Sequence, residues 1–91
     1  MKPREFRVDL KTDGYYMEVD TKKDNCKHEP AHWHLCKDGR KVGKISVPGC
    51  VWSELPSDCT GDVINEAKEV TVNNLEEIES VYKYNSLNGA A

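Results

Sequence analysis

The sequence predicts an α+β domain in which a four-stranded antiparallel sheet, made of two hairpins, packs on a C-terminal helix. Two patterns indicate this fold class. In the first half of the chain apolar residues alternate with polar ones, as in strands, whereas beyond residue 61 they recur every three or four residues, as in a helix. The 91 residues suffice for one domain, which we expect to span 1–87 and to end in a flexible tail at 88–91.

The first hairpin is expected around an Asp-Gly turn. Apolar and charged residues alternate over residues 6–10 and the alternation resumes over 15–19, with Asp13-Gly14 between them. An Asp-Gly pair favours the tight turns that join antiparallel strands. Residues 20–29 are polar and show no periodicity, so we expect a loop there.

The second hairpin is expected to pair residues 32–36 with residues 42–47, through a turn at 37–40 that contains Gly39. Pro30 stands just before the first of these strands, where a missing backbone donor is tolerated.

The alternation within 32–36 assigns its side chains to two faces. Because successive side chains of a strand point to opposite sides, Trp33 and Leu35 should enter the core. His32, His34 and Cys36 should then lie on the second face of the sheet or at its rim.

The C-terminal third is expected to be helical after a loop at 48–61. Apolar residues repeat at helical spacing from Asp62 onward, and acidic residues stand near the start of this segment, as the helix dipole favours. Residues 70–74 are poor helix formers, so we expect a kink or a break into two helices there.

Composition limits the class of protein. With 37% hydrophobic and 32% charged residues the chain is too apolar for disorder. No apolar run approaches the roughly 20 residues that span a bilayer, and no hydrophobic leader follows the first residues, so we expect a cytoplasmic protein. In a reducing compartment the four cysteines are expected to be free thiols. They are Cys26, Cys36, Cys50 and Cys59.

All three histidines fall in one short segment, as His28, His32 and His34. Histidine transfers protons near neutral pH and binds metal ions, so this cluster is the candidate functional site. Basic residues outnumber acidic ones over 21–44, whereas acidic residues dominate 54–91, and a basic surface around the histidines can meet phosphate. The sequence shows no Gly-rich phosphate loop, no G-x-S-x-G elbow and no H-E-x-x-H motif.

The histidine segment resembles the signature of a small bacterial family of unknown function. The string His28-Glu29-Pro30-Ala31-His32-Trp33-His34-Leu35 is similar to the Asp-His-x-Pro-Pro-His-Phe-His that members of this family carry. Lys27 stands where the family has an acid, which would orient a histidine. The resemblance implies one component of a toxin–antitoxin-like pair, with a small protein partner. Further similar positions are Gly39, 44–47 and 74–78.

One hypothesis for the site is a ribonuclease-like toxin that acts on RNA. His32 and His34 would be the catalytic acid and base, with His28 assisting, and Trp33 would stack a base if it were exposed. Nearby cations would bind phosphate. They are Lys37, Arg40 and Lys41.

A second hypothesis is a metal site, with zinc as the possible ion. His32 and His34 stand two apart on one strand face, where their imidazoles can converge on one ion. His28, Cys26 or Cys36 would complete a tetrahedral set.

Two further interpretations involve neither catalysis nor a metal ion. The protein is then a partner-binding or inhibitor module, with Trp52 as an interface anchor and the acidic helix facing a basic partner. Alternatively, the histidines only hydrogen-bond to loop carbonyls. The sequence does not indicate the oligomeric state. We expect a toxin–antitoxin-like component whose functional site is the histidine cluster.

Overall fold

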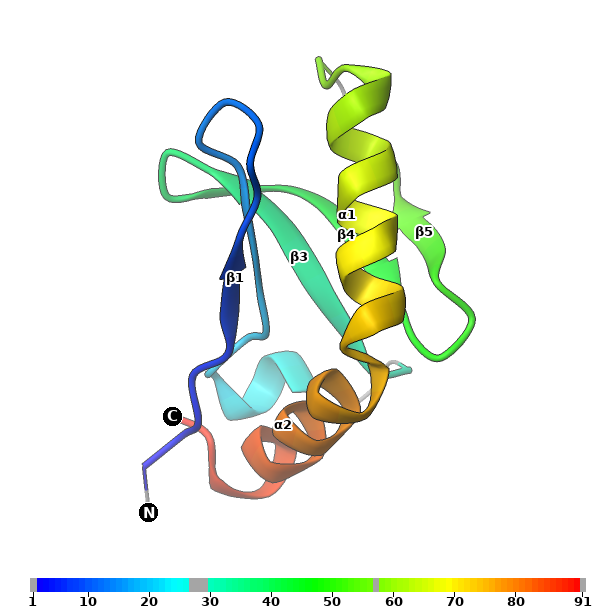
Figure 1. Ribbon diagram of the computed structural model, residues 1–91. Helices are drawn as coiled ribbons and strands as arrows, with labels where there is room; N and C mark the ends of the chain where they lie inside the picture. Colours follow the sequence, from blue (N-terminus) through cyan, green and yellow to red (C-terminus); the bar gives the residue numbers. More distant parts are fainter. Residues whose placement is uncertain (1, 27–29, 57, 91) are drawn as a thin grey trace.

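The computed structural model describes residues 2–26, 30–56 and 58–90. Within this part of the chain, five strands form one antiparallel sheet whose spatial order follows the sequence, and two helices come after it (Figure 1). The predicted α+β class with an antiparallel sheet is therefore confirmed. The elements are β1 (Arg7–Asp9), β2 (Tyr16–Glu18), the 3₁₀ helix η1 (Lys23–Cys26), β3 (His32–Lys37), β4 (Arg40–Ser46), β5 (Val51–Glu54), α1 (Gly61–Asn73) and α2 (Leu75–Asn88).

The sheet has one strand more than the four predicted. β5 lies in the expected loop at 48–61 and pairs with β4, with Trp52 opposite Ile45. Three of its four residues are exposed, so no apolar alternation marks it in the sequence. The expected loop at 20–29 likewise contains the short helix η1.

Both hairpin turns have the backbone that an Asp-Gly pair favours. Asp13 and Gly14 have φ of 50° and 75°, and Asp38 and Gly39 have φ of 52° and 77°. Two consecutive residues with positive φ match the twist of the flanking strands, and glycine adopts this conformation without a steric penalty. Both hairpins are thus confirmed.

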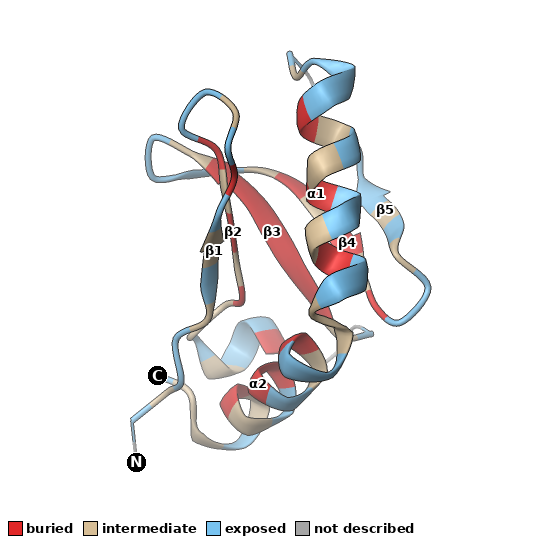
Figure 2. Cartoon of the chain, viewed as in Figure 1, coloured by how far each residue is buried: buried red, intermediate tan, exposed pale blue. Residues whose placement is uncertain are grey.

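The core joins the sheet to buried residues of both helices. Trp33 and Leu35 of β3 are fully buried, as predicted, and Figure 2 shows β3 buried along most of its length. The Trp33 Nε1–H donates to Thr71 Oγ1 of α1 at 2.9 Å, and the Phe6 ring stacks on Trp33 with centroids 5.7 Å apart. Trp33 could stack a nucleobase only if it were exposed, and its ring is fully buried.

The C-terminal helical region is broken, as the poor helix formers at 70–74 predicted. α1 begins after Thr60, whose side chain accepts a hydrogen bond from the Val63 N–H, and it ends at Asn73. Asn74 has a non-helical φ of −131°, and α2 starts at Leu75. In Figure 1 α1 runs along the sheet, whereas α2 turns away and lies beside η1.

The C-terminal segment, where a flexible tail was expected at 88–91, is described as far as residue 90. Asn88 is the last residue of α2, and the Ala90 N–H donates to the Thr21 carbonyl at 2.8 Å. The Lys23 N–H in turn donates to the Ala90 carbonyl at 2.9 Å. The C-terminal segment is thus fastened to the chain just before η1. Among the described residues, no helix has the length and apolar character needed to cross a membrane.

Candidate metal centre

The two described histidines share the face of β3 that lies opposite Trp33. His34 pairs with Lys44 of β4 and His32 pairs with Ser46. Their exposures are only 3% for His32 and 7% for His34, so both are more buried than an open sheet face or rim would leave them. His28, the third predicted catalytic residue, lies outside the described residues.

Tyr82 explains part of this burial. Its ring, on α2, lies 5.0 Å from the His32 ring between centroids, and the His32 and His34 rings lie 5.2 Å apart. α2 therefore reaches the face that bears the histidines, whereas α1 contacts the opposite face through Thr71. The two helices enclose different faces of the same strand.

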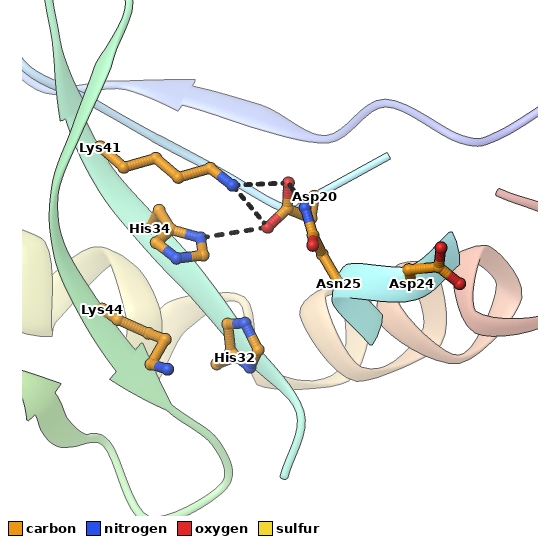
Figure 3. A pocket seen from close by; sticks show the side chains of 7 residues that line it. All are labelled: Asp20, Asp24, Asn25, His32, His34, Lys41 and Lys44. Atoms are coloured by element: carbon orange, nitrogen blue, oxygen red, sulfur yellow. Dashed lines mark hydrogen bonds and ion pairs between the residues drawn. The ribbon is translucent and has the colours of Figure 1, made fainter. Parts of the chain in front are cut away.

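Asp20, which follows β2, supplies a carboxylate that the sequence did not single out. Its Oδ2 lies 3.5 Å from the His34 Nδ1, and Lys41 Nζ donates to both carboxylate oxygens at 2.9 Å (Figure 3). In the family pattern that the histidine segment resembles, an acid stands at the position that Lys27 occupies in this chain. In the fold, the acid beside His34 comes from position 20 instead.

The backbone of Asp20 is also fixed. Its carbonyl accepts a hydrogen bond from the Asn85 Nδ2 of α2 at 2.8 Å and from the Cys26 thiol at 3.7 Å. Asn25 of η1 donates to Asp20 Oδ1 at 3.4 Å. Together with Lys41 of β4, these contacts hold Asp20 from three elements, β4, η1 and α2.

Asp20, His32 and His34 together offer a set of metal ligands. One ligand atom from each lies within 4.8 Å of the other two. Two imidazoles and a carboxylate suit Zn²⁺ and similar divalent ions, and three protein ligands leave a fourth tetrahedral position open.

His32 is oriented by a carbonyl. Its Nδ1 lies 2.9 Å from the Pro30 carbonyl oxygen. Because a carbonyl only accepts, Nδ1 carries the proton and the lone pair of the neutral ring is on Nε2. Metal-bound histidines commonly donate their second N–H in this way. This contact also agrees with the hypothesis that the histidines only hydrogen-bond to loop carbonyls. That hypothesis accounts for His32 but not for His34.

His34 is different, because its Nδ1 is buried and has no hydrogen-bond partner among the described residues. The contact with Asp20 at 3.5 Å is too long for a hydrogen bond. Two ligand atoms on one tetrahedral zinc ion, each about 2.0–2.1 Å from it, lie roughly 3.4 Å apart. The separation of these two atoms therefore fits two ligands of one ion better than a donor and an acceptor.

The protonation states of His34 and Asp20 suit metal ligands, since an ion binds a neutral imidazole and an ionised carboxylate. Burial and then the Lys41 charge lower the pKa of His34 to about 4, although the Asp20 charge partly opposes both. For Asp20, burial favours a higher pKa, but the Lys41 hydrogen bonds and charge, with His34, outweigh it and lower the pKa. At neutral pH His34 is therefore neutral and Asp20 is anionic.

The two cysteines proposed as additional ligands do not belong to this set. Burial raises the pKa of the Cys26 thiol to about 11 and that of the Cys36 thiol to about 12, so both carry their protons at neutral pH. The Cys36 thiol approaches the His34 carbonyl at 3.8 Å rather than the imidazole. All four cysteines are free, as expected.

Of the three cations predicted to bind phosphate, only Lys41 lines the pocket at the histidines. Lys37 Nζ lies 4.5 Å from the centre of the Tyr15 ring, and Arg40, the first residue of β4, is exposed. Lys44, which the sequence did not single out, lines the pocket as well. Its place opposite His34 follows from the register of β3 and β4, which alternation alone does not specify.

Trp52, the predicted interface anchor, is half-buried on β5. Its ring covers Gly43, where a Cβ atom would lie 3.1 Å from the indole. Its Nε1 is buried and has no hydrogen-bond partner among the described residues. Trp52 thus packs on the neighbouring strand, and its role as an anchor stays a prediction.

The site opens into a pocket of about 340 Å³. All of its lining side chains are polar or charged, and Figure 3 shows how they surround the space between β3, β4 and η1. The lining residues are Asp20, Asp24, Asn25, His32, His34, Lys41 and Lys44.

No protein-family model, curated protein or solved structure matches the chain. The resemblance to the histidine-rich bacterial family therefore stays a prediction.

Proposed function

We propose that the protein is a small zinc-binding domain whose ion is held by Asp20, His32 and His34. The observation that carries this proposal is the His34 Nδ1, which is buried without a hydrogen-bond partner among the described residues and lies 3.5 Å from an Asp20 oxygen. A buried polar nitrogen left unsatisfied costs about 1–3 kcal/mol, and coordination to an ion would remove that cost.

The ligand set favours zinc over harder cations. Ca²⁺ and Mg²⁺ prefer oxygen ligands, whereas the site offers two imidazoles and one carboxylate. A zinc ion with three protein ligands supplies Lewis-acid chemistry and lowers the pKa of a bound water to about 7.

The surrounding residues have supporting roles in this proposal. Pro30 fixes the His32 tautomer through its carbonyl, and Lys41 keeps the Asp20 carboxylate anionic through two hydrogen bonds. Asn85 holds the backbone of Asp20. Each contact orients a ligand without itself offering one to the ion.

The test is metal titration of the purified protein after chelator treatment. We expect one Zn²⁺ per chain by calorimetry and, with Co²⁺, the visible absorption of a tetrahedral site. Asp20→Asn and His34→Ala should each weaken binding more than about 100-fold, because even outer-shell partners contribute about 10- to 100-fold. Asp24→Asn, which changes a pocket carboxylate outside the ligand set, is the matched control and should bind as the wild type does.

Two results would contradict the proposal. One is the absence of stoichiometric binding by folded wild-type protein, and the other is equal affinity in wild type and His34→Ala. Intense sulfur-to-cobalt charge transfer that disappears in Cys36→Ser would replace the ligand set with one that contains a thiolate.

A second candidate function is metal-independent cleavage of RNA by a toxin component. It is supported by the presence of His32, His34 and Lys41 around one pocket, the three side chains that acid–base cleavage of a phosphodiester requires. The small partner implied by the resemblance would then be the antitoxin.

This second function is tested by bacterial growth after induced expression. Wild type and His32→Ala/His34→Ala are compared at matched soluble levels, and RNA cleavage is assayed with and without a chelator. Arrest by wild type alone, with chelator-resistant cleavage, supports the acid–base mechanism, whereas equal growth of both strains rejects it.

A further inference from the structure

Gly89, the first residue after α2, lies where three backbone groups leave no room for a side chain. A Cβ atom at this position would lie 2.5 Å from the Asn85 carbonyl oxygen, 2.7 Å from the Thr21 carbonyl oxygen and 2.7 Å from the Lys23 nitrogen. Gly89 has φ of −68° and ψ of 168°, a conformation that other residues adopt freely. Glycine is therefore required here by space, and the obstacles are backbone atoms that cannot rotate away.

The close approach at Gly89 brings the next residue into hydrogen-bond contact on both sides. The Ala90 N–H donates to the Thr21 carbonyl at 2.8 Å, and the Ala90 carbonyl accepts from the Lys23 N–H at 2.9 Å. These bonds make a parallel bridge between Ala90 and Lys22. Figure 1 shows the chain after α2 returning to the segment that leads from β2 into η1. The end of the last helix is thus joined to the start of η1.

η1 is otherwise weakly attached. Of its four residues only Cys26 is buried, and η1 packs chiefly on α2 rather than on the sheet. A segment that buries little apolar surface opens at a lower free energy than the strands of the core. η1 can therefore leave its place while the sheet stays folded.

η1 also forms one wall of the pocket at the histidines. Asp24 and Asn25 of η1 line this pocket together with Asp20, and Figure 3 shows η1 across the pocket from β3 and β4. Asn25 donates to Asp20 Oδ1 at 3.4 Å, and the Cys26 thiol donates to the Asp20 carbonyl at 3.7 Å. Displacement of η1 would therefore widen the pocket and remove two contacts from Asp20.

We propose that Gly89 and Ala90 form a latch that holds η1 against the pocket, and that opening of the latch releases η1 while the sheet stays folded. In the closed state the wall formed by η1 is in place. In the open state both hydrogen bonds of Ala90 are broken, and His32 and His34 stay on β3 beside a wider pocket. The latch is independent of the proposed metal centre, because its contacts join backbone groups.

Thiol modification of the full chain tests the latch, because Cys26 lies in η1 and Cys36 lies in the central strand β3. The rate at each cysteine is followed by mass spectrometry of its peptide. Gly89→Ala displaces Ala90, so the rate at Cys26 should rise at least about tenfold, since opening no longer breaks two backbone hydrogen bonds. The rate at Cys36 should stay within about twofold of the wild type, because β3 opens only with the sheet.

Gly61→Ala is the matched control. It makes the same substitution at the start of α1, where an added Cβ atom meets nothing within 4 Å, so it should not raise the rate at either thiol. Equal acceleration at Cys26 and Cys36 in Gly89→Ala would show that the glycine stabilises the whole fold. An unchanged rate at Cys26 would show that the latch does not hold η1. Either result overturns the proposal.

Hydrogen exchange of the wild type supplies a test that needs no variant, and it decides the matter if Gly89→Ala does not fold. The Ala90 and Lys23 amides both donate in the latch, so they should exchange with one common free energy of opening. This free energy should be lower than that of the β3 amides. Exchange of the Ala90 and Lys23 amides only together with those of β3 would mean that η1 opens with the whole fold, and it would overturn the latch.

Discussion

Asn85 in α2 donates a hydrogen bond to the backbone carbonyl of Asp20, with 2.8 Å between Nδ2 and the oxygen. Asn85 is fully buried, and the same side chain accepts from the Arg4 N–H at 2.8 Å and donates to the Arg4 carbonyl at 2.9 Å. One amide thus joins the N-terminal segment, the candidate ligand and the last helix. The position of the carboxylate depends on the packing of α2.

Replacement of Asn85 by Ala should therefore affect both stability and the site. Three buried or part-buried backbone groups lose a partner, so we expect a loss of about 2–4 kcal/mol in the free energy of unfolding, measured with urea. Zinc affinity should fall about 10- to 100-fold at temperatures where the variant is folded. Asn73→Ala, at an exposed position of α1, is the control and should change neither. Unchanged zinc affinity in folded Asn85→Ala would show that the amide does not position Asp20.

The hydrogen bond between Trp33 and Thr71 should matter to stability alone. Thr71→Val keeps the shape of the side chain but removes the oxygen that accepts from the Trp33 Nε1–H. A buried donor left unpaired costs about 1–3 kcal/mol, which urea denaturation followed by far-UV circular dichroism will measure. Val72→Thr, at the exposed neighbour, should change stability by less than about 0.5 kcal/mol. If both variants unfold at the wild-type midpoint, the Trp33 Nε1–H finds another hydrogen-bond acceptor when Thr71 Oγ1 is removed.

Stability of the metal-free protein should fall on acidification from pH 6.5 to pH 4. Burial lowers the pKa of His34 from 6.5 to about 4 in the folded state. Between these values the unfolded chain binds a proton at His34 and the folded chain does not, so the free energy of unfolding rises with pH across this window. The change amounts to about 3 kcal/mol, since one pKa unit corresponds to about 1.4 kcal/mol.

Urea denaturation at several pH values, with chelator present, tests this dependence, and His34→Gln should flatten it between pH 6.5 and 4. Asp20 acts in a separate window. Its folded pKa is lowered below 3.8, so its contribution is present above that value and is lost only as the pH falls further. A slope that His34→Gln leaves unchanged would assign the acid sensitivity to other groups.

The four thiols should react with a disulfide reagent in two groups. Cys26 and Cys36 are buried and their pKa values are raised to about 11 and 12, so they should react only as fast as the protein opens. Cys50 and Cys59 are half-buried and should react first. Two fast equivalents and two slow ones are expected at pH 7.4, and the fast phase should be absent from Cys50→Ser/Cys59→Ser. Four equivalents with one rate would contradict this grouping.

The elements whose ends are set by local residue preferences were predicted from the sequence. Both Asp-Gly turns were located because positive φ has a residue preference, and the helix break followed from the low propensity of 70–74. β5 was missed because its exposed residues give no alternation, and it is held by pairing with β4 rather than by an apolar face.

The candidate site was predicted only in part, because alternation assigns a face but not the neighbours across it. It placed His32 and His34 on one face of β3, which the register confirms. It gave no sign of Asp20, which stands in an aperiodic polar stretch and reaches His34 through the placement of η1 and α2. Lys41 was selected as a phosphate ligand, and its hydrogen bonds to both oxygens of Asp20 were not foreseen.

The order of the strands has a consequence for how the pocket is assembled during synthesis. Each strand pairs with its predecessor in the chain, so the sheet, including both described histidines, requires only contacts that are short in sequence and form readily. The Asn85 contacts with Arg4 and Asp20 instead span 81 and 65 residues. A growing chain can thus pair β3 with β4 while Asp20 still lacks its anchor. Only chains extended past residue 85 can hold both histidines and the carboxylate together, so α2 sets the moment at which the proposed zinc site would first be complete.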